Sequence, residues 1–285
     1  MHDIAVSEPA TARRRLPLCS PLALLNRLLS DRGVAITSGL AYGPLPRHRL
    51  DLYRPEAASG PLPVILFLYG GSWKIGNRAD YRFLGIRLAR EGFAVAIADY
   101  RLYPEVRFPD FLEDCAAATA WVAANAARFG ADPGAITLAG HSAGAYNAVM
   151  LGLDPEWLAA AGWSRERLRG IIGLAGPYDF APGGDLVREV FASAADPAIT
   201  QPVHFVDGSN PPLLLLTGRH DWLVHARNSS VLATKVRAAG GPVHLKSYRA
   251  LGHIGIMMAF APLPWARRAV VRDVVRFAAT PRVGP

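Results

Sequence analysis

Apolar residues gather in short runs along the chain, and segments with helical spacing separate these runs. The runs predict buried strands, at residues 64–68, 93–99, 135–140, 170–176, 212–218 and 243–249. The segments between or after them predict helices, at residues 80–92, 111–129, from 142 onward, 226–239 and 265–278. Strands that alternate with helices form a mostly parallel sheet with helices on both faces. The pattern therefore predicts a doubly wound α/β fold.

Two segments depart from this alternation, and we expect them to cover one end of the sheet. Residues 177–211 lack clear periodicity over a length that usually marks a functional loop or cap. Near the N-terminus, leucines at helical spacing favour an amphipathic helix lying on the domain over an export signal; they are Leu22, Leu25, Leu28 and Leu29. We therefore expect a mobile tail over 1–19 and a single domain over 20–285, with cap elements at about 20–40 and 177–211.

The composition excludes several classes of partner. The formal charge is +8, but the arginines are scattered, so we expect no nucleic-acid partner. No stretch of eighteen unbroken apolar residues occurs, so we expect no stable membrane insertion. The two cysteines, Cys19 and Cys115, imply no disulfide framework and favour a reducing, cytoplasmic location. His220 and His225 lack a third ligand at suitable spacing, so we expect no metal.

The segment Gly140-His141-Ser142-Ala143-Gly144 joins a predicted strand to a predicted helix. A G-x-S-x-G motif in this context is typical of a nucleophile elbow, in which glycines permit a sharp turn and the serine hydroxyl points outward. The alternative is a glycine-rich phosphate loop. The lysine that such a loop requires is absent, which favours Ser142 as a nucleophile.

A serine nucleophile needs a base, and the base needs an orienting acid; on this architecture they follow the serine in the order acid, then histidine. Asp221 follows the strand at 212–218, and His253 follows the strand at 243–249. Asp179 also follows a strand and is the competing acid. His141 adjoins the nucleophile, but we expect its side chain to point elsewhere.

The sequence "FLYGGSW" places two glycines directly after the strand at 64–68. Bare backbone amides can approach a substrate there and stabilise the negative charge that develops on its carbonyl oxygen. We expect the amides of Gly70, Gly71 and Ala143 to form this oxyanion hole. A tight turn is the alternative explanation for the glycine pair alone.

These motifs, together with "DYRLYPEVRFPDF", "LTGRHDWLV" and "LGHIG", resemble an α/β-hydrolase of the esterase/lipase superfamily over residues 50–277. The resemblance is to the hormone-sensitive-lipase-like and carboxylesterase groups. It implies hydrolysis of carboxylic esters through an acyl-enzyme on Ser142, without a cofactor. The chain departs from the pattern at Tyr69, where those families have histidine, and at Ser72, where a third glycine is common. We expect the oxyanion hole to survive because backbone donors do not depend on side-chain identity.

The substrate is expected to be a small-molecule ester with a short to medium acyl or aryl group. Large apolar residues near the strand ends and in the cap segment are the candidate pocket residues: Trp73, Tyr178, Phe205, Trp222, Ile256 and Met257. Amide hydrolysis of the arylformamidase kind is an alternative, and a non-catalytic binding protein with the same fold is another. The sequence leaves the oligomeric state open, with a homodimer as one alternative.

Overall fold

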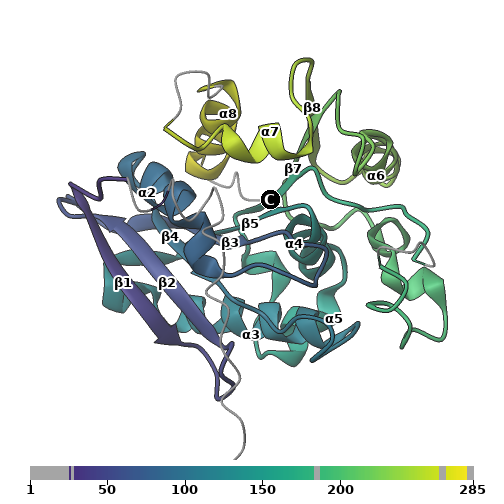
Figure 1. The fold of residues 1–285 in the computed structure, drawn as a ribbon, viewed down its shortest axis with the longest axis horizontal. Helices are drawn as coiled ribbons and strands as arrows, with labels where there is room; N and C mark the ends of the chain where they lie inside the picture. The colour runs from purple at the N-terminus through teal and green to yellow at the C-terminus, as the bar shows by residue number, and fades with distance from the viewer. Residues whose placement is uncertain (1–25, 27–28, 183–186, 263–267, 281–285) are drawn as a thin grey trace, which may run out of the picture.

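An eight-stranded sheet forms the centre of the molecule in the computed structural model (Figure 1). The structure describes residues 26, 29–182, 187–262 and 268–280. The predicted tail at 1–19 and most of the predicted N-terminal helix lie outside these residues. The strands are β1 Val34–Ala41, β2 Arg49–Pro55, β3 Leu62–Leu68, β4 Ala94–Ala98, β5 Ala131–His141, β6 Gly170–Leu174, β7 Leu213–Gly218 and β8 Val243–Tyr248.

The order of the strands across the sheet is β1-β2-β4-β3-β5-β6-β7-β8. The six strands from β3 to β8 pair in parallel, whereas β2 runs antiparallel to both β1 and β4. The predicted mostly parallel sheet is therefore confirmed. Because β4 and β5 lie on opposite sides of β3, the winding direction changes at β3, and ligand sites form at the carboxyl ends of strands beside such a point.

The helices cover both faces of the sheet, as predicted. They are α2 Arg82–Arg90, α3 Asp110–Asn125, α4 Ala143–Leu153, α5 Pro155–Ala160, α6 Arg227–Ala238, α7 His253–Met258 and α8 Arg268–Ala279. In Figure 1, α3, α4 and α5 lie together on one face, while α2 and α8 lie on the other. Among the described residues, no helix combines the length and the apolar character needed to cross a membrane.

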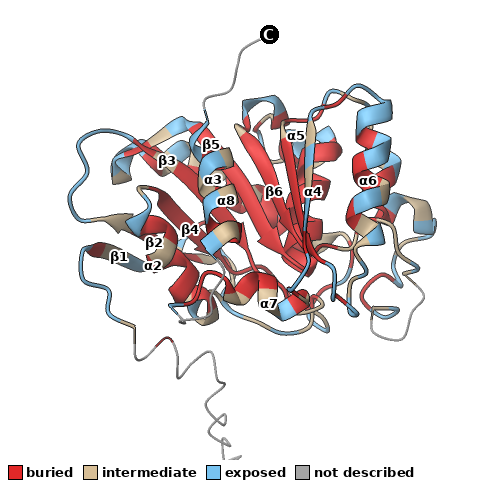
Figure 2. Ribbon diagram, turned by 90° about the horizontal axis from the view of Figure 1, so that it is seen from above, coloured by how far each residue is buried: buried red, intermediate tan, exposed pale blue. Residues whose placement is uncertain are grey.

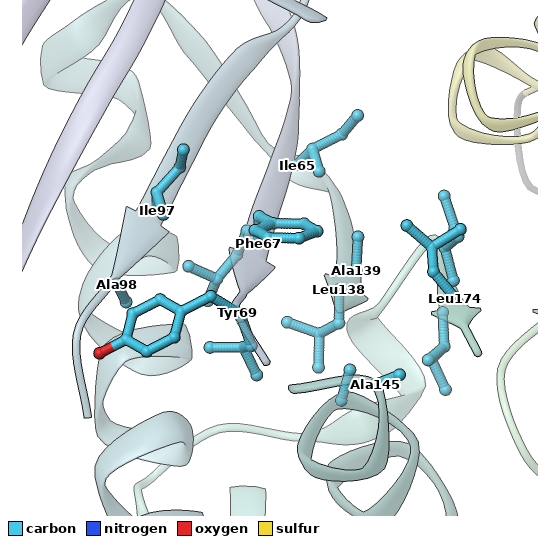
Figure 3. Close-up of a cluster of buried hydrophobic side chains, with 14 of the residues drawn as sticks. Ile65, Phe67, Tyr69, Ile97, Ala98, Leu138, Ala139, Ala145 and Leu174 are labelled. Atoms are coloured by element: carbon cyan, nitrogen blue, oxygen red, sulfur yellow. The ribbon is translucent and has the colours of Figure 1, made fainter. Parts of the chain in front are cut away.

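The central strands are buried on both sides, as their unbroken apolar runs require. Figure 2 shows this as a red sheet between helices whose outer faces are exposed. Figure 3 shows Phe67, Leu138 and Leu174 from β3, β5 and β6 in one apolar cluster, with Ala145 of α4 nearby. Helix α4 is buried along its whole length. The element that begins at the candidate nucleophile is thus held by the core.

The prediction of a cap element at about 20–40 is wrong for its C-terminal part. Residues 34–41 form strand β1, which pairs with β2 at the edge of the sheet. Only Val34 of its eight residues is buried, as expected for a strand at the edge of a sheet. Asn26, in the N-terminal segment, binds residues more than fifty positions further along the chain. Its side-chain amide donates to the carbonyl oxygens of Ala79 (3.0 Å) and Asp80 (2.8 Å). Its oxygen accepts from the amide of Phe83 at the start of α2 (3.0 Å).

The segment at 177–211 contains two short 3₁₀ turns in its described part, Pro197–Thr200 and Pro202–Phe205. The second of these turns lies against α4 and α6. Two further residues of the segment, Phe180 and Phe191, meet edge to face with ring centroids 5.4 Å apart. The segment therefore packs against the elements that carry the candidate site.

Candidate active site

Ser142 occupies the sharp turn between β5 and α4, with φ 54° and ψ −121°. Such a conformation costs a non-glycine residue about 1–3 kcal/mol and persists only where the surroundings impose it. A side chain at either flanking glycine would collide with backbone: a Cβ on Gly140 would lie 2.1 Å from the carbonyl oxygen of Gly144, and one on Gly144 2.0 Å from that of Leu68. The amide of Ser142 also donates to the carbonyl oxygen of Leu174 on the neighbouring strand (2.9 Å). The motif therefore forms a strained, tightly packed elbow.

The structure brings together the three residues that the chain order predicts. The Nε2 atom of His253 lies 2.9 Å from the Oγ of Ser142. The other ring nitrogen of His253, Nδ1, lies 2.8 Å from the Oδ2 of Asp221. All three residues are buried, with relative exposures of 8% for Ser142, 6% for His253 and 4% for Asp221. They come from the ends of β5, β7 and β8.

The carboxylate of Asp221 is fixed by its own loop. Its Oδ1 accepts hydrogen bonds from the amides of Leu223 (3.1 Å) and Val224 (2.8 Å), which leaves Oδ2 for His253. The competing acid, Asp179, forms an ion pair with Arg227 instead, at 3.4 Å. Of the two candidates, Asp221 is the one in contact with the imidazole.

His141 packs against His253, a contact that we did not predict. The two imidazole rings lie 4.8 Å apart, and Nε2 of His141 is 3.1 Å from the carbonyl oxygen of His253. Burial, reinforced by the neighbouring His253, lowers the pKa of His141 to about 3. His141 is therefore neutral near pH 7, and its Nε2–H donates to that carbonyl. It links the elbow to the segment that carries the base.

The segment after β3 approaches Ser142 closely at Gly70, a predicted oxyanion-hole residue. A Cβ on Gly70 would lie 2.9 Å from the Cβ of Ser142, so a glycine is needed for this approach. Gly70 is not among the described residues that line the cavity beside Ser142. Ser72 lies instead beside the reacting centre, in the same cavity wall as Ser142 and Ala143.

The backbone of this segment is unusual. Gly71 has φ 133°, and the non-glycine residues Ser72 and Trp73 have φ 53° and 56°. The carbonyl oxygen of Gly71 accepts hydrogen bonds from the amides of Lys74 (3.0 Å) and Ile75 (3.1 Å). Consecutive positive φ values in residues with side chains concentrate strain at this point, as at many functional sites. The sequence signal that could have identified Ser72 is its position directly after the glycine pair.

A cavity of about 410 Å³ opens beside Ser142. The described residues that line it combine an apolar wall with a polar edge; they are Ser72, Trp73, Ser142, Ala143, Pro177, Asp179, Phe180, Val187, Leu223, Val224, His225, Arg227 and Asn228. Pro177, Asp179, Phe180 and Val187 come from the predicted cap segment. A cavity of this size and character suits a small organic ligand.

Trp73 lines the cavity as predicted, and the other five predicted pocket residues lie elsewhere. Tyr178 is fully buried, with its hydroxyl against the backbone of Gly173 and Gly176. Ile256 and Met257 lie on the buried face of α7, and Phe205 packs against the core. Trp222 is 80% exposed. The path of an irregular segment is not visible in the sequence: Pro177 and Asp179 line the cavity, whereas Tyr178 between them is buried in the core.

Within the residues that the structure describes, no group of three or more His, Cys, Asp or Glu side chains has an arrangement that could hold a metal ion. The chemistry available to the site comes from the hydroxyl of Ser142, the imidazole of His253, the carboxylate of Asp221 and the backbone amides around them. This set can transfer an acyl group to a serine oxygen.

Comparison with known proteins gives a consistent result. A family model described as BD-FAE matches residues 50–236. The probable isoprenylcysteine alpha-carbonyl methylesterase ICME of Oryza sativa subsp. japonica is 30% identical over 262 residues, covering 84% of this chain and 63% of that protein. Esterase LipC of Mycobacterium tuberculosis is 30% identical over 257 residues, covering 83% of this chain and 62% of that protein. The chain thus spans about three fifths of the length of these curated relatives.

Solved structures show the same fold. Esterase B from Lactobacillus rhamnosis aligns with a TM-score of 0.76 at 22% identity, covering 87% of this chain and 86% of that one. A truncated carbohydrate esterase from gut microbiota aligns with a TM-score of 0.75 at 21% identity, covering 88% of this chain and 97% of that one. At these identities the likeness concerns the fold alone, and it establishes an α/β-hydrolase fold.

Proposed function

Because the chain belongs to the BD-FAE family of α/β-hydrolase esterases, we propose that it is a serine carboxylesterase that cleaves small-molecule esters through an acyl-enzyme on Ser142. The observation that carries this proposal is the series of hydrogen bonds from Asp221 through His253 to Ser142, at 2.8 and 2.9 Å. This series ends at the wall of the cavity beside Ser142.

The first step is attack on the ester carbonyl. Nε2 of His253 accepts the proton of Ser142 as Oγ forms a bond to the carbonyl carbon, and the carbonyl π pair moves onto oxygen. Asp221 keeps the proton of His253 on Nδ1 and stabilises the imidazolium that forms. The two amides that bind Oδ1 of Asp221 hold the carboxylate in this orientation.

Backbone amides stabilise the negative oxygen of the tetrahedral intermediate. Ala143 is the first residue of α4, so its amide lies at the positive end of a buried helix. The amides of Gly71 and Ser72 are the proposed donors from the segment after β3, with Ser72 replacing Gly70 in the role that we predicted from sequence. Removal of one donor of this kind typically lowers kcat by about 10²–10³.

Three further proton transfers complete the reaction. The protonated His253 gives its proton to the departing alkoxide, the C–O bond breaks, and the alcohol leaves an acyl group on Ser142. A water molecule then loses a proton to His253 and attacks the acyl carbon; the bond to Oγ breaks, Oγ takes the proton back from His253, and the carboxylic acid is released. None of these reaction steps requires a cofactor.

The cavity supports a short to medium acyl or aryl ester as substrate. Trp73, Phe180, Val187 and Leu223 supply apolar surface around a space of about 410 Å³. A drug-sized ligand typically fills a cavity of about 300–1,000 Å³, so a small apolar group fits and a long chain would extend out of it. The relatives named as isoprenylcysteine methylesterases add a methyl ester of a prenylated cysteine to the substrates worth testing.

The test is a panel of p-nitrophenyl esters from acetate to decanoate, together with farnesylcysteine methyl ester and an N-formyl arylamine. We expect turnover of the shorter aryl esters by the full chain and none above background by a folded Ser142→Ala variant. Turnover that survives in Ser142→Ala would contradict the mechanism. Faster cleavage of the formyl amide than of every ester would move the assignment to an amidase.

A further inference from the structure

Tyr69, which replaces the histidine common in similar esterases, lies at the centre of a stack of three tyrosines. Its ring stacks on Tyr100 with centroids 4.9 Å apart and on Tyr81 with centroids 5.5 Å apart. All three are buried, and Tyr69 is completely so. Figure 3 shows the Tyr69 ring with its hydroxyl directed away from the apolar cluster. We call these three residues the tyrosine stack and residues 69–76 the oxyanion loop.

One outer tyrosine binds the peptide unit between Tyr69 and Gly70. The hydroxyl of Tyr100 donates to the carbonyl oxygen of Tyr69 (2.7 Å). Because a peptide unit is planar, this bond restrains the direction in which the chain enters Gly71 and Ser72.

The phenol of Tyr69 ties the loop to a buried ionic network. It donates to Oδ1 of Asp99 (2.9 Å) and accepts from Nη2 of Arg47 (2.7 Å). Asp99 is 5% exposed and also accepts from the amide of Arg78 (2.7 Å) and from its guanidinium. Burial, followed by the charge of Asp99, raises the pKa of Tyr69 above its ordinary value, so the phenol remains a neutral donor.

Arg47 joins the two ends of the oxyanion loop. The same Nη2 that binds the phenol of Tyr69 donates to the carbonyl oxygen of Gly76 (2.9 Å). Gly76 has φ 117°, and a Cβ there would lie 2.9 Å from the ring of Tyr69. The loop is therefore closed at its base by Arg47, which bonds to both Tyr69 and Gly76, and by the packing of Gly76 on the Tyr69 ring.

We propose that Tyr69 is a positioning residue for catalysis: through its bonds to Asp99 and Arg47 it holds the oxyanion loop so that the Gly71 and Ser72 amides face the oxygen bound beside Ser142. The inference rests on the proposed esterase function for its consequence in turnover. The positive φ values of Ser72 and Trp73 explain why the oxyanion loop needs this restraint, because strained backbone relaxes unless its surroundings restrain it.

The experiment compares Tyr69→Phe with Tyr42→Phe. Tyr42 is a matched control, since it is also a buried phenol bonded to Asp99, but to the carbonyl oxygen (2.6 Å) and not to the loop. We expect Tyr69→Phe to lower kcat roughly 10-fold or more with KM unchanged, because misplaced donors weaken transition-state binding alone. The affinity for a trifluoromethyl ketone should fall by the same factor as kcat/KM. Tyr42→Phe should leave these quantities within about twofold of wild type.

A second readout does not depend on ester turnover. Hydrogen–deuterium exchange of the backbone amides at 69–76 should become severalfold faster in Tyr69→Phe and stay unchanged in Tyr42→Phe. Equal exchange and equal kcat in the two variants would overturn the inference. Should the wild-type chain cleave no ester, the proposed function fails, and the exchange comparison still decides whether Tyr69 holds the loop.

Arg47→Met provides the test if Tyr69→Phe does not fold. This side chain is 29% exposed, and its loss removes the bonds to Tyr69, to Gly76 and to the carbonyl oxygen of Tyr100. We expect the same pattern of lower kcat, unchanged KM and faster exchange at 69–76. Wild-type kcat and exchange in a folded Arg47→Met variant would contradict the positioning role.

Discussion

The Nε2 atom of His253 lies 2.9 Å from the Oγ of Ser142, although 111 positions along the chain separate the two residues. Parallel strands make this contact possible, because β5, β7 and β8 all end at the same edge of the sheet (Figure 1). Each residue needs only a short turn after its strand to reach the others. The site is therefore a direct consequence of the strand order.

Asp221→Asn should lower kcat by about 10⁴-fold with little change in KM, because an amide at this position no longer holds His253 in the tautomer that can accept the serine proton. Steady-state kinetics on an aryl ester measures both quantities. Asp179→Asn is the comparison, since Asp179 lies beside the cavity but pairs with Arg227. A larger loss in Asp179→Asn than in Asp221→Asn would transfer the acid role to Asp179.

Gly144→Ala should destabilise the fold, although alanine is favoured over glycine in a helix by about 1 kcal/mol. The new Cβ would lie 2.0 Å from the carbonyl oxygen of Leu68, and overpacking of this kind costs about 1–3 kcal/mol or more. Urea denaturation of Gly144→Ala and of Gly60→Ala gives the comparison, because a Cβ at Gly60 meets nothing within 4 Å. Equal midpoints in the two variants would mean that the elbow is less tightly packed than described.

Stability should fall below pH 6.5 partly because of His141. Its native pKa is about 3, whereas an unfolded histidine has a pKa of about 6.5, so between these values the unfolded state binds a proton that the native state excludes. The contribution of His141 to the free energy of unfolding is at its full value above pH 6.5. It falls by roughly 1.4 kcal/mol per pH unit as the pH drops from 6.5 toward 3. The free energy of unfolding of His141→Gln, measured from pH 7.5 to 5, should depend less steeply on pH than that of wild type. Parallel curves would show that His141 does not exclude a proton.

Leu223→Trp should narrow the cavity and change the chain-length preference. Leu223 lines the cavity and is 43% exposed, so a larger side chain can be accommodated without unfolding the core. We expect the ratio of kcat/KM for octanoate to that for acetate to fall several-fold. Trp222→Ala is the control: this neighbour is 80% exposed and lies outside the cavity wall, so the ratio should not change. If the ratio changed in Trp222→Ala but not in Leu223→Trp, Trp222 would belong to the binding site, as the sequence first indicated.

The sequence predicts the sheet and the approach of Ser142, Asp221 and His253 because both depend on local patterns. Apolar runs mark the strands, glycines at 140 and 144 mark the elbow, and the chain order places the acid and the base after later strands. The sequence does not indicate strand β1, because its residues lack the alternation of a half-exposed strand and follow a leucine-rich segment that suggests a helix.

The sequence does not predict the contacts that depend on side-chain direction in irregular segments. Tyr178 and Asp179 are adjacent, yet one faces the core and the other the cavity. The bond between Tyr69 and Asp99 spans 30 positions, and no local pattern specifies it. Ser72 lines the cavity and Gly70 does not, which likewise depends on the path of the backbone in an irregular segment.

Covalent labelling tests the central claim most directly. The wild-type protein should react with a fluorophosphonate, and mass spectrometry of the digest should locate a single adduct on Ser142. A folded Ser142→Ala variant should remain unlabelled, and Asp221→Asn should label far more slowly than wild type. An adduct on another residue of the wild-type protein, or equal labelling in Ser142→Ala, would contradict the assignment of Ser142 as the nucleophile.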